Sequence, residues 1–463
     1  MQNIINSMHS SLKLGMTYDS SGENLAGFYL PSEDRSTHVY VLGSSGVGKS
    51  KGLATWILDD IMKGNGCGVI DPHGDLIDDI VGNLDGFGNV ILVEMTDPEN
   101  IIGFNPLEQQ EGIDPYTQTL ELVEVFRKIW NLSDDKTPRL IEILRNAVLT
   151  LIEAGGTMLD IEPLLTNEDF RQEKMKYVTY EAVDSFWRNR FEKWDEKERI
   201  SNIESTLNKV SSFTSDPRIR LMLSAKKSTI DFRQIMDDEK VVLINLAKGV
   251  LRTNSFLLGA LFVAKIQMAA MSRVDLPPSE RKPFYFYVDE FQNYATLSFA
   301  EIMSEARKYG LSLILAHQSL VQLDQHLRDI ILGNAKNFVV YRCDRQDAEL
   351  VIKYIKDYDP YDWKSRSDSS TKYFTKDEQR ENAISELVSL ETQVAVLKTK
   401  GKEPWMFRTY DLPESERLEE NKARLRSANR ASGKTLSLEA LDVAVTFPKD
   451  PSTETQEPTS FVD

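Results

Sequence analysis

The chain has 463 residues, of which 41% are hydrophobic, and its formal net charge is -17. This length allows a large core and two or three domains, whereas the acidic balance argues against a uniformly basic nucleic-acid-binding surface, though not against a basic lining inside a pore. Cys67 and Cys343 are far apart and lack metal-ligand spacing, which argues against a disulfide framework or a zinc site and favours a reducing compartment.

Residues 1–36 are polar and rich in Ser, Gly and Asp. Only the segment GFYL, at 27–30, predicts a short strand, so we expect a leader that packs beside the first strand of a sheet. The leader has no signal-peptide core, and no uninterrupted apolar run in the chain approaches the roughly 18 residues that cross a bilayer. We therefore expect a cytoplasmic protein without a transmembrane segment of its own.

The segment HVYVLGSSGVGKS, at 38–50, is an apolar strand followed by a glycine-rich turn and a helix-forming sequence. It matches the complete G-x-x-x-x-G-K-[ST] pattern of a phosphate-binding loop, and the strand-to-helix context makes a chance glycine turn a poor alternative. The pattern predicts binding of ATP with Mg²⁺. The predicted nucleotide-binding residues are Gly43, Ser44, Ser45, Gly46, Val47, Gly48, Lys49 and Ser50, the last also as a metal ligand.

Strand signals and helical signals alternate through the rest of the chain, which predicts an α/β fold with a mainly parallel sheet covered by helices. Strand signals vanish between about 114 and 220, where long helical periodicity predicts an all-helical insertion. Residues 359–382 and the segment beyond 413 have the composition of mobile segments. We expect a leader at 1–36 and a flexible tail at 411–463. Between them, one α/β domain is divided into two halves, at 37–113 and 231–410, by the all-helical insertion at 114–230.

Two carboxylates follow the apolar strand FYFYV, where a parallel sheet collects its ligands. Asp289 is predicted to hold Mg²⁺, and Glu290 to polarise the water that attacks the terminal phosphate. Gln318 ends the next strand and is predicted to contact this phosphate, whereas His317 is predicted to pack rather than to bind a ligand. A solvated turn is the alternative for the acidic pair, but the upstream phosphate loop favours catalysis.

Arg307 lies in the run EARKYG, before the strand that ends at Gln318. An arginine there could reach across a subunit boundary to the nucleotide of a neighbour. Alternatively, Arg307 and Lys308 stabilise the end of a helix before Gly310. Arg342, in VVYRCD, is the rival candidate for this catalytic role.

Several segments resemble the TraG/TraD-type coupling ATPases of conjugative type IV secretion, within the FtsK/HerA superfamily of DNA-pumping motors. They are GSSGVGKS, GVIDPHGDL, IIGFNPL, TPRLIEILRNAVLTLIE, FYVDEFQNYAT, EARKYGLSLILAHQ and ILGNAKNFVVYR, and the similarity covers roughly residues 25–410. The resemblance implies a RecA-like P-loop domain with an inserted all-α domain. It also implies an ATPase that assembles as a hexamer and moves DNA through its centre, with the roles above carried by Lys49, Ser50, Asp289, Glu290, Gln318 and Arg307. The DPHGD turn is a marker of that family, and its residues have no assigned roles. The alternative interpretation is that the turn is purely structural.

Membrane-anchored members of that family carry N-terminal transmembrane helices, and residues 1–36 offer nothing comparable. We therefore expect either recruitment by a separate membrane-anchor protein or a wholly cytoplasmic role. The favoured function is delivery of DNA with its relaxase to a secretion channel. The alternatives are a HerA-like motor for DNA processing, packaging or defence, and a nucleotide-switched module that docks protein cargo.

Overall fold

The computed structural model describes residues 11–19, 23–296, 303–367 and 370–436. Within these residues, eleven strands form one sheet in the order β2-β1-β13-β12-β9-β3-β8-β7-β4-β6-β5. The strands from β9 to β5 run parallel to one another, and the four on the other side run antiparallel. The strands are β1 Leu12–Tyr18, β2 Asn24–Leu30, β3 Val39–Leu42, β4 Gly66–Asp71, β5 Val90–Val93, β6 Val241–Asn245, β7 Phe284–Val288, β8 Leu311–His317, β9 Asn337–Tyr341, β12 Val394–Thr399 and β13 Trp405–Arg408. The predicted α/β fold with a mainly parallel sheet is confirmed.

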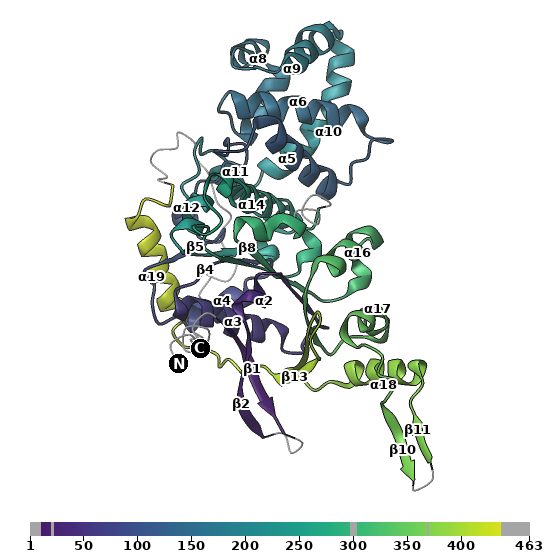
Figure 1. Cartoon of the computed structure of the whole chain (residues 1–463). Coiled ribbons are helices and arrows are strands. Elements are labelled where there is room, and N and C mark those ends of the chain that lie inside the picture. Colours follow the sequence, from purple (N-terminus) through teal and green to yellow (C-terminus); the bar gives the residue numbers. More distant parts are fainter. Residues whose placement is uncertain (1–10, 20–22, 297–302, 368–369, 437–463) are drawn as a thin grey trace, which may run out of the picture.

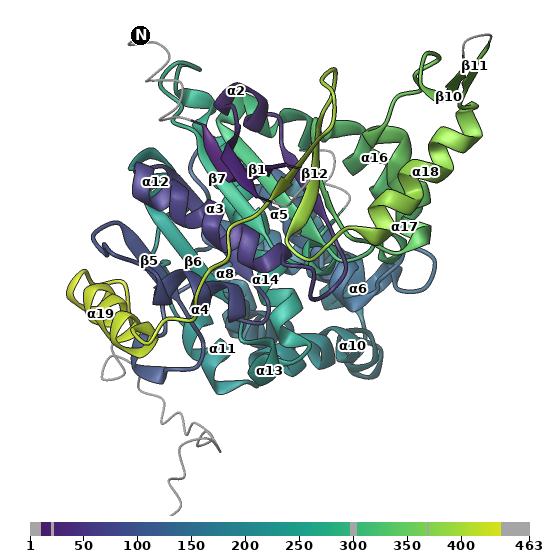
Figure 2. The same cartoon turned by 90° about the horizontal axis from the view of Figure 1, so that it is seen from below.

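Helices cover both faces of this sheet, so the parallel strands are apolar throughout (Figure 2). Along β3, Val39 and Val41 belong to one hydrophobic cluster, and Tyr40 and Leu42 belong to the other. The first cluster includes residues of α3 Lys49–Lys63 and α4 Asp75–Gly82. The second includes residues of α12 Phe232–Asp237, α14 Asn254–Met271, α16 Gln325–Asn334 and α17 Arg345–Ile355.

Helix α14 is the central helix of the second layer. The segment Asn254–Asp275 is long and apolar enough to cross a membrane, but its most apolar 18-residue stretch, with a mean hydropathy of 1.5, is 89% buried inside the protein. It packs against α12 and against α5 Pro115–Trp130. Its apolar composition is therefore that of a core helix.

A group of helices leaves the sheet after β5 and returns before β6, in the upper part of Figure 1. Its entry and exit segments are joined where the Thr229 hydroxyl accepts from the Gly103 N–H at 3.0 Å and the Thr229 N–H donates to the Gly103 carbonyl at 2.9 Å. These helices lie within the segment predicted as an all-helical insertion. They are α5, α6 Pro138–Glu153, α7 Ile161–Thr166, α8 Glu168–Met175, α9 Glu181–Ser185, α10 Glu196–Thr214 and α11 Pro217–Leu223.

The strand predicted at 27–30 is present as part of β2, but the predicted packing of the leader beside the first strand is wrong. Strands β1 and β2 form a hairpin at the far edge of the sheet, next to β13 rather than beside β3. A register shift between Lys13 and Gly15 interrupts the alternation of buried and exposed residues along β1. For this reason the sequence pattern does not predict the strand. The short helix α2 Ser32–Arg35 follows, and its buried Arg35 pairs with Asp60 of α3.

Two segments predicted to be mobile are also ordered in part. Within 359–382, strands β10 Trp363–Ser367 and β11 Ser370–Tyr373 form a hairpin, and helix α18 Lys376–Ser389 begins. Within the predicted tail, α19 Leu418–Ala431 lies along β5, with Leu425 buried and Arg426 donating twice to Glu94 at 2.8 Å. Both helices are polar on one side and take their apolar contacts from distant parts of the chain, which local composition does not reveal. Residues 437–463 of the predicted tail lie outside the described residues.

Candidate active site

The glycine-rich loop connects β3 to α3 at the centre of the parallel sheet. Gly46 has a φ of 75° and Gly48 a φ of 96°, in the left-handed region that favours glycine. Neighbouring elements hold the loop in place, since the Gly43 N–H donates to the His317 carbonyl and the Ser44 N–H to the Arg342 carbonyl. The loop therefore has a fixed shape before any ligand binds.

The loop encloses a space suited to phosphate groups. Helix α3 begins at Lys49, and the N-cap residue Gly48 has no side chain that could bond the first N–H groups of the helix. These N–H groups and the positive end of the helix dipole attract an anion. A cavity of about 350 Å³ lies here, lined by Ser44, Ser45, Gly46, Gly48, Lys49, Ser50, Lys51, Gln318, Thr392 and Gln393. The residues thus fit the nucleotide that the sequence predicts.

Lys49 and Asp289 face each other in this site. Strands β3, β8 and β7 are neighbours, so the residue that begins α3 lies close to the residue that follows β7. Lys49 Nζ is 3.9 Å from Asp289 Oδ1, and the two residues are only 6% and 7% exposed. Burial lowers the pKa of Lys49 and raises that of Asp289, and each charge counteracts the shift of the other. The ammonium is held at the base of the cavity without a close ion pair.

Glu290 accepts two side-chain hydrogen bonds and lies close to two further nitrogen atoms. The Gln318 amide donates to Oε1 at 2.5 Å and the Asn293 amide to Oε2 at 3.2 Å. His73 Nε2 is 3.3 Å and Lys248 Nζ 3.8 Å from Oε2. The Glu290 backbone is left-handed, with φ 45° and ψ 46°, and its N–H donates to Asp289 Oδ1. Such strained backbone is typical of functional sites.

Three of these neighbours of Glu290 were not predicted from the sequence. His73 and Lys248 each follow the carboxyl end of a parallel strand, β4 and β6, and Asn293 lies in the turn after β7. Because these strand ends lie at one edge of the sheet, their side chains meet at Glu290. The signal that could have found His73 and Lys248 is their position after an apolar strand.

The DPHGD turn is both structural and part of the site. The Asp71 carboxylate accepts the N–H groups of His73 at 2.9 Å and Ile77 at 3.1 Å, and thereby fixes the turn into α4. Burial raises the pKa of Asp71 to about 6, although these hydrogen bonds act to lower it. Gly74 has a φ of 100°. The turn holds His73 against Glu290.

The two candidate arginines lie at opposite edges of the sheet. Arg342 directly follows β9, and its half-buried side chain donates to the Leu390 carbonyl at 3.4 Å, beside the glycine-rich loop of its own chain. Arg307 is exposed in the turn before β8, whose other end carries Gln318. The structure therefore places the backbone of Arg342 next to the glycine-rich loop, although Arg342 is not among the residues that line the cavity, and it leaves Arg307 distant from the loop.

His317 is fully buried and bonds the Tyr40 hydroxyl through Nδ1 at 2.9 Å. Burial lowers its pKa to about 3, and the nearby Lys49 adds to the shift. The prediction that His317 packs rather than binds a ligand agrees with this environment. Across the described parts of the chain, no group of three or more His, Cys, Asp or Glu side chains could hold a metal ion by itself.

Comparisons with known proteins match these features. A family model described as the TraM recognition site of TraD and TraG matches residues 283–396, which contain Asp289, Glu290, Gln318 and both arginines. The type 4 coupling protein DotL of Legionella pneumophila is 20% identical over 360 residues, with 65% of this chain and 46% of DotL covered. The chain thus spans less than half the length of this relative.

Solved structures share the fold. The plasmid coupling protein TrwB in complex with a non-hydrolysable GTP analogue superposes with a TM-score of 0.60 at 15% identity, covering 87% of this chain and 92% of that one. TrwB in complex with ADP and Mg²⁺ gives 0.59 at 15% identity, covering 88% and 96%. VirB4 of Thermoanaerobacter pseudethanolicus gives 0.53 at 16% identity, covering 87% and 97%. The fold is that of a RecA-like P-loop NTPase, and within this fold residues 283–396 are similar to the TraG/TraD family model.

Proposed function

We propose that the protein is an ATP-hydrolysing motor that moves DNA toward a type IV secretion channel. The observation that carries the proposal is the meeting of Lys49, Asp289, Glu290 and Gln318 beside the glycine-rich loop, at the carboxyl edge of adjacent parallel strands. This combination supplies a cation for the phosphates, a carboxylate for a metal ion and a second carboxylate for water. The similarity to the coupling proteins TrwB and DotL supports the choice of cellular process.

Each residue has a defined role in this proposal. The loop N–H groups and Lys49 hold the phosphates, while the Ser50 hydroxyl and Asp289 hold Mg²⁺, whose charge offsets that of the phosphate oxygens when it is bound. Glu290 accepts a proton from the attacking water at its carboxylate. Gln318 bonds Glu290 and also lines the cavity, so it can report the state of the terminal phosphate to β8.

The assembly belongs to the same proposal. We infer a homo-hexameric ring in which Arg307 of one subunit completes the nucleotide site of the next, because Arg307 is exposed and far from the site of its own chain. DNA would pass through the centre of the ring, with a relaxase and a membrane-anchor or channel protein as partners. Arg342 would then serve the site within its own subunit.

ATPase activity measured with no DNA, with single-stranded DNA and with double-stranded DNA tests this proposal, with particle mass determined in parallel. We expect turnover to rise with DNA only where particles reach the mass of a hexamer. Turnover that ignores DNA in assembled particles would contradict the motor and favour the cargo-docking module. Glu290→Gln serves as the control, because it removes DNA-stimulated turnover while nucleotide binding remains.

A further inference from the structure

The segment between α17 and α18 carries a hairpin that projects from the body of the protein. Within the described part of the chain, strands β10 and β11 pair with each other and with no further strand. Figure 1 and Figure 2 both show them extending beyond the start of α18. An isolated two-stranded hairpin is only marginally stable in water. The projecting hairpin is therefore suited to contact a partner rather than to support the core.

Three large aromatic side chains are exposed at the base of this hairpin. Tyr358 and Tyr361, in the loop before β10, are 49% and 78% exposed, and Tyr373, which ends β11, is 50% exposed. The Phe374 N–H donates to the Asp362 carbonyl at 2.9 Å, so the neighbours of Tyr373 and Tyr361 are in contact. Large apolar groups that gather on a surface mark an interaction site.

Hydrogen bonds hold the loop that carries Tyr358 and Tyr361 in one shape. The buried Gln379 of α18 accepts from the Asp359 N–H at 3.1 Å and donates to the Asp359 carbonyl at 2.6 Å. The Asp359 carboxylate accepts from the Tyr361 N–H at 2.8 Å. Because the backbone beneath the two rings is fixed, a ligand that binds them loses less conformational entropy than it would on a loose loop.

A cavity of about 480 Å³ lies beside this loop, between α17 and α18. Three carboxylates line it, but two of them pair with cations outside the cavity. Glu349 contacts Arg345 at 3.0 Å, and Asp357 contacts Lys398 at 2.9 Å. The cations that line the cavity are Lys353, Lys356, Lys376 and Arg380. This lining therefore has an excess of positive charge in a chain whose net charge is -17.

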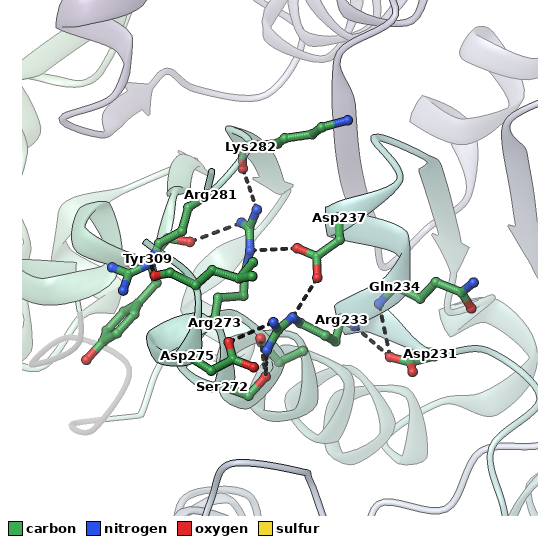
Figure 3. Close-up of polar contacts among 12 residues, drawn as sticks. Asp231, Arg233, Gln234, Asp237, Ser272, Arg273, Asp275, Arg281, Lys282 and Tyr309 are labelled. Atoms are coloured by element: carbon green, nitrogen blue, oxygen red, sulfur yellow. Dashed lines mark hydrogen bonds and ion pairs between the residues drawn. The ribbon is translucent and has the colours of Figure 1, made fainter. Parts of the chain in front are cut away.

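The cations of the cavity also differ from those of the ion-pair network in Figure 3. There, Arg233 contacts Asp237 at 2.6 Å and Asp275 at 2.8 Å. The exposed cavity cations for which the described residues provide no ion pair are Lys356, Lys376 and Arg380. Their charged groups are available to an anionic ligand.

We propose that this surface binds single-stranded nucleic acid, with bases stacked on the tyrosines and phosphates bound by the cations. We call it the tyrosine platform, and it consists of Tyr358, Tyr361, Tyr373, Lys356, Lys376 and Arg380. A single strand fits because its bases are free to stack on a ring, whereas the bases of a duplex cover one another. The choice of DNA as the nucleic acid rests on the proposed function.

Helix α18 connects the tyrosine platform to the nucleotide cavity. It begins at Lys376, in the platform, and its 14 residues span about 20 Å. Shortly after its end, Gln393 lines the nucleotide cavity, and its N–H donates to the Val47 carbonyl of the glycine-rich loop at 2.8 Å. One helix thus joins a strand bound at the platform to the site of proposed ATP turnover.

Binding of fluorescein-labelled oligo-dT to the full chain, without nucleotide, tests the platform. We expect Tyr361→Ala and Tyr373→Ala each to weaken binding about fivefold or more, because each removes a stacked base. Tyr361→Phe keeps the ring and should bind as the wild type does. Tyr177→Ala is the matched control, because Tyr177 is 58% exposed in the all-helical insertion.

Two results of this measurement would overturn the proposal. One is equal binding by the wild type and by the double variant that combines Tyr361→Ala with Tyr373→Ala. The other is a wild-type protein that does not bind oligo-dT.

A duplex and an acidic peptide separate a single strand from other polyanions. Tyr361→Ala should leave the affinity for a duplex of the same length nearly unchanged, since paired bases cannot stack on the ring. An equal loss for both nucleic acids would show that stacking is absent and would overturn the proposal. Polyglutamate that displaces the labelled strand as well as unlabelled oligo-dT does would also overturn it, in favour of an acidic protein segment as the partner.

Salt dependence tests the cations, because a purely structural change would not alter it. The logarithm of the oligo-dT binding constant falls linearly with the logarithm of the salt concentration. Lys356→Ala and Arg380→Ala should each reduce this slope by about 0.7, the value for one lost phosphate contact on a single strand. Lys282→Ala is the control, since Lys282 pairs with Glu239 and lies outside the platform. Unchanged slopes in both platform variants would overturn the proposal.

The ratio of ATP turnover with oligo-dT to turnover without it separates this proposal from the proposed function on which it rests. A wild-type ratio above one that the double tyrosine variant loses supports both. A ratio that the double variant keeps upholds a motor driven by DNA but overturns the platform. A wild-type ratio of one in hexameric particles contradicts the motor, and oligo-dT binding alone then decides whether the platform stands.

Discussion

The two edges of the parallel sheet hold their cations in different ways. At the carboxyl edge, Lys49 is 6% exposed and faces Asp289. At the amino edge, Arg307 is exposed in a pocket without a carboxylate. A buried lysine needs nearby carboxylates to keep its proton, whereas a guanidinium stays charged without them. At the carboxyl edge the buried cation thus has a carboxylate facing it, whereas at the amino edge the exposed Arg307 has no ion pair among the described residues.

The largest expected effect comes from inactivating one edge of the sheet in one protein and the other edge in a second protein, and then mixing the two. Arg307→Ala alone should lower ATP turnover by about 10³-fold or more, since a trans arginine offsets charge on the transferred phosphoryl group. Lys49→Ala alone should lose nucleotide binding. When the two inactive proteins are mixed under assembly conditions, interfaces with an intact loop and an intact Arg307 should recover part of the turnover.

Native mass measurement provides the control, because it shows whether the two variants assemble together. Verified co-assembly without recovered turnover would contradict a trans role for Arg307. The same mixing experiment with Arg342→Ala should give no recovery if Arg342 serves its own subunit, as its contact with Leu390 beside the loop suggests.

At the carboxyl edge, we expect nucleotide binding and catalysis to depend on different residues. Glu290→Gln should bind ATP with nearly unchanged affinity and lower turnover by about 10²- to 10⁴-fold, because an amide cannot accept the proton of the attacking water. Fluorescent-nucleotide binding and single-turnover hydrolysis measure the two quantities. Near-normal turnover would remove Glu290 from its catalytic role.

Sequence patterns predicted the central parts of the fold well. The strands from β3 to β9 have apolar residues on both faces, and the glycine-rich loop and the Asp289–Glu290 pair follow such strands directly. These features are local, so their residues could be named without knowing the neighbours of each strand.

The remainder depends on contacts between distant residues. Strand β1 pairs with β13, which lies near the other end of the chain, and the polar helix α19 covers β5. His73 and Lys248 reach Glu290 only because β4, β6 and β7 are neighbours in the sheet. Local composition does not determine the order of the strands, so the sequence alone could indicate the glycine-rich loop but only one of the side chains that contact Glu290, Gln318.

A smaller effect should come from the donors around Glu290. His73→Ala should lower kcat by about tenfold with little change in KM, since a hydrogen bond to a charged group is worth about 1.5 kcal/mol. His73→Gln keeps a donor near Glu290 Oε2 and should retain more activity than His73→Ala. Steady-state ATPase kinetics measure both parameters, and equal activity of the two variants would contradict a hydrogen-bonding role for His73.

The last prediction concerns stability below pH 6.5 rather than catalysis. His317 is buried with a pKa of about 3, whereas in the unfolded chain its pKa returns to about 6.5. Between these values the unfolded state binds more protons, so the free energy of unfolding falls as the pH falls below 6.5. By pH 5 this group alone should lower the free energy of unfolding by about 2 kcal/mol relative to pH 7.5.

His317→Gln removes this titration. Its free energy of unfolding, measured in urea from pH 7.5 to 5, should therefore fall less steeply than that of the wild-type protein. His326→Gln, at an exposed position of α16, is the matched control and should follow the wild-type protein. If His317→Gln also follows the wild type, burial of a neutral His317 does not set the acid stability of this edge.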